Sequence, residues 1–241
     1  MRNKLLYFIL AAQVISSGAC SQDLGNLLKN VTAGSGNIQG TPTTLEVANG
    51  LKEALSNGVQ KGTTQLSSVN GFFANAAVKI LMPPDAQKVV STLRSIGLGK
   101  QVDDAILSMN RAAEDATKSA APIFLDAIKQ MSIQDAWGIL KGSDTAATAY
   151  LRNKTTIQLT NSFTPVIRQS LDRVDATKYW NTLFETYNKL PFVTKVNPDL
   201  STYVTDKALS GIFYEIGQEE IAIRKNPVER TSDLLKKVFG K

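Results

Sequence analysis

Apolar residues recur every three or four positions along most of the chain, which is the period of an α-helix. The segment 45–66 is one example, in which Leu51 and Leu55 share a face and Thr43 or Thr44 can cap the start. No run alternates apolar and polar residues for long enough to predict a sheet. We therefore predict an all-α fold, with helices over residues 45–66, 85–96, 102–121, 123–131, 132–140, 144–162, 165–174, 180–187, 203–225 and 228–239.

The first of these helices carries a row of residues without bulk. Gly50, Ala54 and Gly58 follow one another at intervals of four, so they lie on one face of the helix. A glycine inside a helix costs about 1 kcal/mol relative to alanine, which suggests that another backbone or a ligand comes close to this row. We favour tight helix packing, and a groove for a ligand is the alternative.

The first twenty residues have the pattern of an export signal. Arg2 and Lys4 precede an apolar run over residues 5–12, which is too short to form a stable membrane span. The small residues Gly18 and Ala19 then lead to Cys20, an ending that resembles the cleavage site of bacterial lipoprotein signal peptides. We expect Cys20 to be lipidated, and the alternative is an ordinary secretory signal that leaves a free thiol.

This signal sets the expected organisation and location of the chain. We predict a signal peptide over residues 1–19, a glycine-rich tether over 20–43 that begins at the lipidated cysteine, and a single compact helical domain over 44–241. Ser21, by analogy with enteric bacteria, favours the outer membrane facing the periplasm. The net charge of +6 could indicate a nucleic-acid partner, but export makes an envelope protein or polymer the expected partner, beside the membrane itself.

Composition limits the available chemistry. The chain has no histidine and one cysteine, so an internal disulfide and the usual histidine ligands of catalytic zinc are excluded. We expect no metal and no cofactor. Catalysis would have to depend on other side chains, and a pair of carboxylates, as in glycoside hydrolysis, is the most credible route. Glu219 and Glu220, with Glu114, are the candidate catalytic residues.

The same carboxylates can belong to a polar network instead. Glu219 follows Ile212 and Ile216 at helical spacing and should point into the apolar seam, whereas Glu220 can pair with a basic residue four positions later. The residues that could complete a buried polar site or a structural ion-pair network are Asn110, Arg111, Lys129, Asp144, Tyr150, Arg152, Lys207 and Arg224.

Short sequence words spread over residues 44–240 resemble a bacterial family known as domain of unknown function 4197. The words occur in the family's order and near its spacing, and they include 51–55, 110–114, 126–131, 138–142, 144–148, 207–209, 219–220 and 234–240. The resemblance implies an exported, helical envelope protein, and it implies no activity because the family has none assigned.

Together these features favour a membrane-anchored lipoprotein that acts as a non-enzymatic binding or interaction module. Two alternatives are a carboxylate-dependent hydrolase of an envelope polymer and a carrier of an apolar ligand beside Gly50, Ala54 and Gly58.

Overall fold

The computed structural model describes residues 43–173 and 199–240, and between these ranges it describes residues 180, 181, 184, 185, 188, 189, 191 and 195. The predicted signal peptide, Cys20 and residues 21–42 of the tether lie outside the described residues. So do Leu183 and Tyr187 of the predicted aromatic helix.

The predicted all-α fold is confirmed. The described part of the chain contains eight α-helices, two short 3₁₀ turns and no strand. The helices are α2 (Thr44–Ser67), α3 (Gln87–Ser95), α4 (Gly99–Thr117), α5 (Ala120–Lys129), α6 (Ile133–Leu140), α7 (Ala146–Asp172), α9 (Leu200–Lys225) and α10 (Asp233–Phe239), and the 3₁₀ turns are η1 (Pro84–Ala86) and η2 (Pro227–Glu229).

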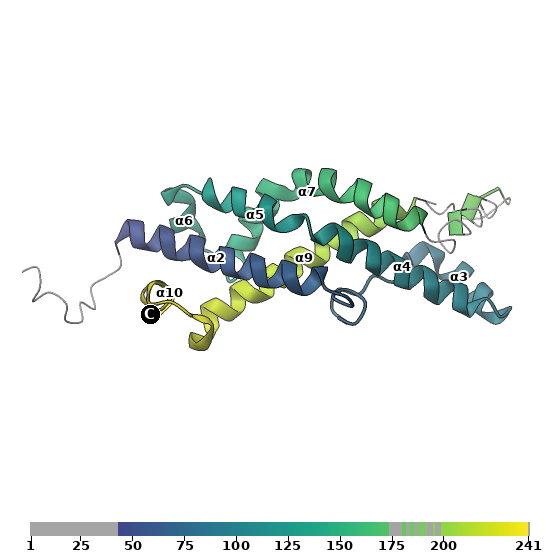
Figure 1. Cartoon of the computed structure of the whole chain (residues 1–241), viewed down its shortest axis with the longest axis horizontal. Coiled ribbons are helices and arrows are strands. Elements are labelled where there is room, and N and C mark those ends of the chain that lie inside the picture. Colours follow the sequence, from purple (N-terminus) through teal and green to yellow (C-terminus); the bar gives the residue numbers. More distant parts are fainter. Residues whose placement is uncertain are drawn as a thin grey trace, which may run out of the picture. The chain divides into compact units, whose positions relative to one another are not determined.

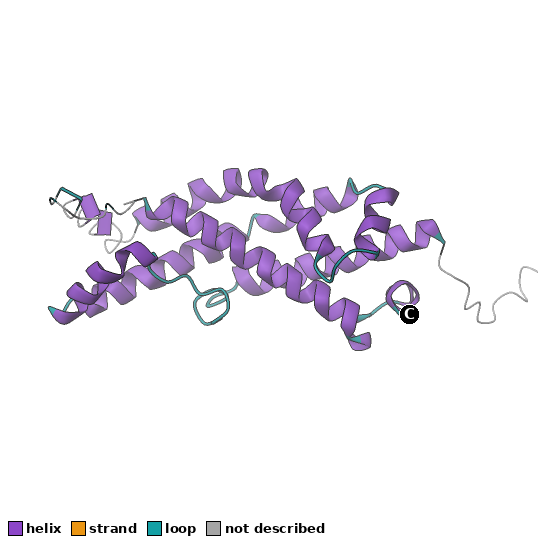
Figure 2. Cartoon of the chain, turned by 180° about the vertical axis from the view of Figure 1, so that it is seen from behind, coloured by secondary structure: helices purple, strands orange, loops and turns teal. Residues whose placement is uncertain are grey.

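The helical domain is an elongated bundle built around α9. This helix packs against both α2 and α7, while α5 packs between α2 and α7, and α4 lies along α7 (Figure 1). The turn between α3 and α4 lies at one end of the domain, and the beginning of α2 lies with α10 at the other (Figure 2). The bundle thus brings the start and the end of the described chain together.

Aromatic rings fill the centre of the bundle. Phe124 of α5 and Phe213 of α9 meet edge to face with their ring centroids 5.7 Å apart. Phe163 of α7 is fully buried and belongs to the same core cluster. Each such ring removes a large apolar area from water, so these positions bind three helices into one core. Trp180 and Phe184 form a second edge-to-face pair with centroids 4.7 Å apart.

Two predicted helix boundaries differ from the structure, each near a proline. The helices predicted over 144–162 and 165–174 are one helix, α7, which continues through Pro165. Pro122, which was expected to start or kink the helix over 123–131, lies in the first turn of α5, which begins at Ala120. Pro165 is exposed, while Phe163 and Ile167 beside it are fully buried, so packing holds the helix together where one backbone hydrogen bond is lost. The chain instead breaks between α4 and α5, at residues 118–119.

Capping explains where the well-predicted helices begin. Thr43 forms a capping box with Glu46 at the start of α2, and Ser132 forms one with Asp135 at the start of α6.

Within the described residues, no helix is both long enough and apolar enough to cross a membrane.

Candidate functional site

Glu220, a candidate catalytic residue, caps a neighbouring helix. It lies on α9, and its carboxylate accepts hydrogen bonds from the backbone N–H groups of Ala147, at 3.0 Å, and Thr148, at 2.8 Å. The hydroxyl of Thr148 donates to it as well. These residues form the first turn of α7, whose own N-cap residue, Thr145, supplies no side-chain hydrogen bond. The carboxylate therefore satisfies the free N–H groups and the positive end of the α7 dipole.

Arg224 extends this contact to a third helix. It is one turn beyond Glu220 on α9, and its Nη2 atom lies 2.8 Å from the Glu220 carboxylate, which confirms the predicted pair. The guanidinium also donates to the carbonyl oxygens of Ile139, at 2.9 Å, and Leu140, at 3.5 Å. These carbonyls belong to the C-terminal turn of α6, where a positive charge is favourable. One buried ion pair thus joins the end of α6 to the beginning of α7.

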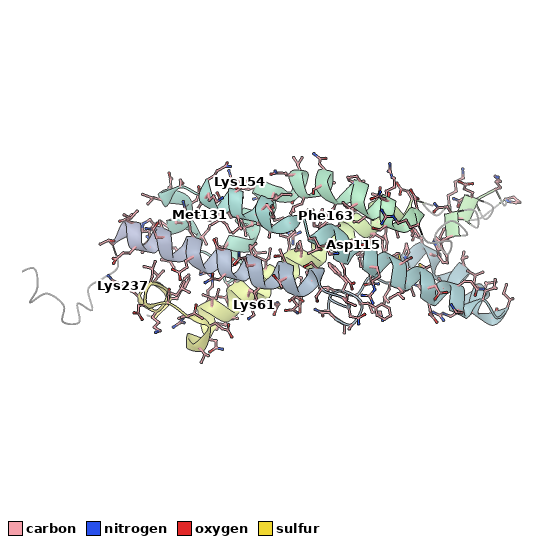
Figure 3. The ribbon with its side chains drawn as sticks, in the orientation of Figure 1. Lys61, Asp115, Met131, Lys154, Phe163 and Lys237 are labelled. Carbon is pink, nitrogen blue, oxygen red and sulfur yellow. The ribbon has the colours of Figure 1, made fainter. Side chains whose placement is uncertain are left out.

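The second candidate, Glu219, has a partner that the sequence argument did not select. Its carboxylate lies 2.9 Å from the ammonium group of Lys61 on α2, and Lys61 also lies 3.5 Å from Glu229. The Glu219 carboxylate raises the pKa of Lys61, so this lysine stays charged. Lys61 lies where α2 and α9 approach each other (Figure 3). The pair therefore bridges two helices at the surface.

The third candidate, Glu114, holds the loop between α2 and α3. Its carboxylate accepts hydrogen bonds from the backbone N–H groups of Phe72, at 3.2 Å, and Phe73, at 3.3 Å. Arg111 pairs with it at 2.6 Å and also donates to the side-chain oxygen of Asn70 at 2.8 Å. Asn70 has a positive φ of 70°, a conformation that asparagine tolerates better than most residues. The α4 side chains thus fix the backbone of this turn.

Asn110 holds the next part of the same loop. Its side chain is fully buried, accepts a hydrogen bond from the N–H of Ile80 at 2.9 Å and donates to the Ile80 carbonyl at 2.8 Å. The side-chain amide thus pairs with both backbone groups of Ile80, as a neighbouring strand would. Tyr203 of α9 adds a hydrogen bond to the carbonyl of Leu81 at 2.9 Å. The loop is therefore held by α4 and α9 together.

The remaining candidate polar residues are not hydrogen-bonded to the members of either group. Lys129 and Lys207 are exposed, and Arg152 is an exposed residue whose guanidinium covers the buried ring of Phe213 at 4.4 Å. Asp144 is half exposed and pairs with Lys225 at 2.6 Å, and Lys225 and, to a lesser extent, Arg224 lower the pKa of Asp144, so this carboxylate lies beside the Glu220–Arg224 pair. Burial raises the pKa of Tyr150. The structure thus brings the predicted residues into two separate clusters, Asn110–Arg111–Glu114 and Glu220–Arg224, rather than one network.

These contacts define what the carboxylates can do. Glu220 and Glu114 accept hydrogen bonds from backbone N–H groups at the start of α7 and in the loop after α2, and Glu219 forms an ion pair with the exposed Lys61 of α2. Among the residues described, no group of three or more cysteine, aspartate or glutamate side chains is placed to hold a metal ion. The geometry assigns Glu114 and Glu220 to fixing helix ends and loops, and Glu219 to joining α2 and α9.

The glycine row of α2 faces two different elements. A Cβ atom at Gly58 would lie 3.3 Å from the Cβ of Glu219 on α9, so Gly58 serves the approach of α2 to α9. A Cβ atom at Gly50 would lie only 2.8 Å from Cγ2 of Val238 on α10. The expected tight packing is what the structure contains. The space beside Gly50, where an apolar ligand was an alternative, is filled by α10.

Beneath α10 a small cavity remains between α2 and α9. Its volume is about 10 Å³, and its lining is almost entirely apolar, including Leu51, Leu55, Ile216 and Phe239. A cavity of this size is near the lower limit for a single water molecule. No larger ligand fits there while α10 is in place.

An ion pair fastens α10 across this groove. Lys237 lies 2.7 Å from the carboxylate of Glu46 in the first turn of α2, at the end of the domain where α2 begins (Figure 3). Hydrogen bonds from Lys237 and then from Thr43 lower the pKa of Glu46 to about 2. The carboxylate is consequently ionised over the whole physiological pH range.

Comparison with known proteins identifies a family for this chain. Residues 41–240 match the family described as "Protein of unknown function (DUF4197)", a span that includes every helix named above. Neither the curated proteins nor the solved structures that were compared contain a match to the chain.

Proposed function

The chain belongs to this family of proteins of unknown function, and we propose that it is an exported lipoprotein that acts as a non-enzymatic binding module of the cell envelope. In this proposal Cys20 carries the lipid, residues 21–43 form the tether, and the helical bundle binds an envelope partner.

The anchor is supported by the pattern of the first twenty residues. The basic start, the short apolar run and the small residues before Cys20 fit a lipoprotein signal. Several acyl chains would bind a bilayer strongly, since each buried CH₂ contributes about 0.8 kcal/mol. Ser21 favours the outer membrane with the domain in the periplasm. The expected partner is then an envelope protein or polymer, and not a nucleic acid.

The binding role, as opposed to catalysis, is supported by one observation. The carboxylates that a histidine-free enzyme would need are occupied by structural contacts, since Glu220 caps α7 and Glu114 holds the 68–82 loop. A general acid must hold and release a proton, and these side chains accept hydrogen bonds from backbone groups that need a permanent acceptor.

The anchor is tested by the mass of the N-terminal peptide of the chain purified from cell envelopes. We expect a peptide that begins at Cys20 and carries acyl groups. A Cys20→Ser variant should lose both the acyl mass and its presence in the membrane fraction. A Ser21→Ala variant is the matched control for lipidation and should keep both. An unmodified Cys20 thiol on the exported chain would contradict the anchor.

A further inference from the structure

We propose that the groove between α2 and α9 beneath α10 is a docking site for an amphipathic helix of a partner protein, and that α10 occupies this site in the free chain. This inference names the binding surface of the proposed interaction module and therefore rests on that function. Four observations on α10 and its groove support it.

The groove is shaped for a helix that can be exchanged. Gly58 and Gly62 lie against α9, with their Cβ positions 3.3 Å from Glu219 and 3.7 Å from Glu215 respectively. At Gly50 the three atoms nearest to the Cβ position belong to Val238 and Leu234 of α10. A side chain at position 50 would therefore collide first with α10. The glycine lets a helix lie close to this part of α2.

The buried contact of α10 lies beside the main core, and Phe239 is the α10 residue that packs against both. Leu235 is fully buried, but it forms a small cluster with Ala54 and Ile223, against which Phe239 packs. The large core that joins the other helices does not include these three buried residues. Departure of α10 would therefore expose the small cluster and the core residues that Phe239 covers, whereas Phe124, Phe163 and Phe213 would stay packed between the other helices.

The third observation is that α10 is short and is fastened by exposed ion pairs. The helix has seven residues, and a helix this short is not stable without its tertiary contacts. The ion pairs that fasten it and its connection to α9, Lys237 to Glu46 and Glu229 to Lys61, involve side chains that are one-third exposed or more. Exposed pairs are screened by water and salt, so each contributes only modestly to the attachment of α10. In our proposal α10 therefore exchanges between a position that covers the groove and one that leaves it open.

The chemistry of α10 identifies the kind of partner that fits. Its apolar residues Leu234, Leu235, Val238 and Phe239 follow the spacing of one helical face. Lys237, on the flank of that face, meets the ionised Glu46 at the rim of the groove. A competing segment must therefore be an amphipathic helix with leucine, valine or phenylalanine on one face and a basic residue at the flank.

The test uses a fluorescent peptide with the sequence of residues 229–241 as the probe, and the exported full chain, kept soluble by Cys20→Ser. A double variant, Leu235→Ala with Val238→Ala, weakens the packing of α10 on the groove and leaves the α2 and α9 residues of the groove unchanged. Because binding to a mostly covered site is reduced by the open fraction, the peptide should bind this variant at least about tenfold more tightly than the unchanged chain. Fluorescence anisotropy measures both affinities.

A second substitution locates the binding. Adding Gly50→Ala to the double variant places a methyl group where the bound helix must lie, and peptide binding should be lost. Gly138→Ala is the matched control, since nothing lies within 4 Å of the Cβ position at this helical glycine. A peptide carrying Leu235→Asp should not bind any form of the chain.

Four results would overturn the proposal. The first is a folded double variant, verified by circular dichroism, that does not bind the peptide, and the second is binding that survives Gly50→Ala. The third is hydrogen exchange of the amides of residues 233–239 in the unchanged chain that occurs only with global unfolding. Cross-links from Lys237 to Glu46 between differently labelled copies would assign the groove to a second copy of this chain, which contradicts the partner proposed. None of these readouts depends on lipidation, so failure here is distinct from failure of the anchor.

Discussion

Glu220 and Arg224 are one turn apart on α9 and together close the ends of two other helices. The carboxylate accepts hydrogen bonds from N–H groups in the first turn of α7, and the guanidinium donates to the last two carbonyl oxygens of α6. Each charge thus lies at the helix end whose dipole it complements, and each is the counter-ion of the other. The pair therefore fixes the position of the α6–α7 connection on α9.

Replacing Glu220 by glutamine should destabilise the fold. The amide keeps one acceptor oxygen, but it removes the negative charge and leaves Arg224 buried without a counter-ion. Breaking a buried pair in this way costs about 3 kcal/mol, which urea unfolding followed by circular dichroism would measure. Asp144→Asn is the control, because its ion pair with Lys225 is exposed, and its unfolding midpoint should hardly change. Equal midpoints for the two variants would remove the structural role of Glu220.

Replacing Asn110 by alanine should release the loop that precedes α3. Alanine leaves the N–H and carbonyl groups of Ile80 buried without partners, at a cost of about 2 kcal/mol. Hydrogen exchange should show a faster amide at Ile80 than in the unchanged chain. Asn49→Ala, at an exposed position of α2, is the matched control. An Ile80 amide that stays protected in Asn110→Ala would contradict this role.

Replacing Gly58 by leucine should destabilise the domain. The Cβ position of Gly58 lies 3.3 Å from Glu219, so a larger side chain must push α2 away from α9. Overpacking of this kind costs about 1–3 kcal/mol, measurable by denaturant unfolding. Gly138→Leu, at an open position, should change stability much less. An unaltered free energy of unfolding in Gly58→Leu would mean that the close approach of the two helices can relax.

The sequence predicts contacts within one helix better than contacts between helices. The spacing of four between Glu220 and Arg224 is enough to predict their pair, because both side chains lie on one face of α9. That the pair caps α6 and α7 depends on how three helices are placed, and no local pattern carries this information. Lys61 was missed as the partner of Glu219 for the same reason, since it reads as an exposed residue of α2.

The glycine row shows the same division. Gly50, Ala54 and Gly58 correctly predicted a close approach, because a helix accepts glycine only where something replaces the lost stability. The row does not reveal that α10 is the neighbour of Gly50 while α9 is the neighbour of Gly58. Pro165 wrongly predicted a boundary between two helices, because buried residues on both sides of it keep α7 continuous.

The attachment of α10 should weaken in acid. The hydrogen bond from Lys237, with those from Thr43, lowers the pKa of Glu46 from 4.5 to about 2. A depressed pKa means that the pair contributes stability above pH 4.5, and that this contribution is lost as the pH falls from 4.5 toward 2. Protection of the amides of residues 233–239 against hydrogen exchange should therefore fall between pH 5 and pH 3, after correction for intrinsic rates. In Glu46→Gln this protection should already be reduced at pH 5. Asp103→Asn, whose ion pair with Arg94 lies at the other end of the domain, is the control and should leave α10 unaffected. If Glu46→Gln keeps full protection at pH 5, Lys237 does not hold the helix, and the apolar contacts of Leu235 and Val238 alone set the opening of the groove.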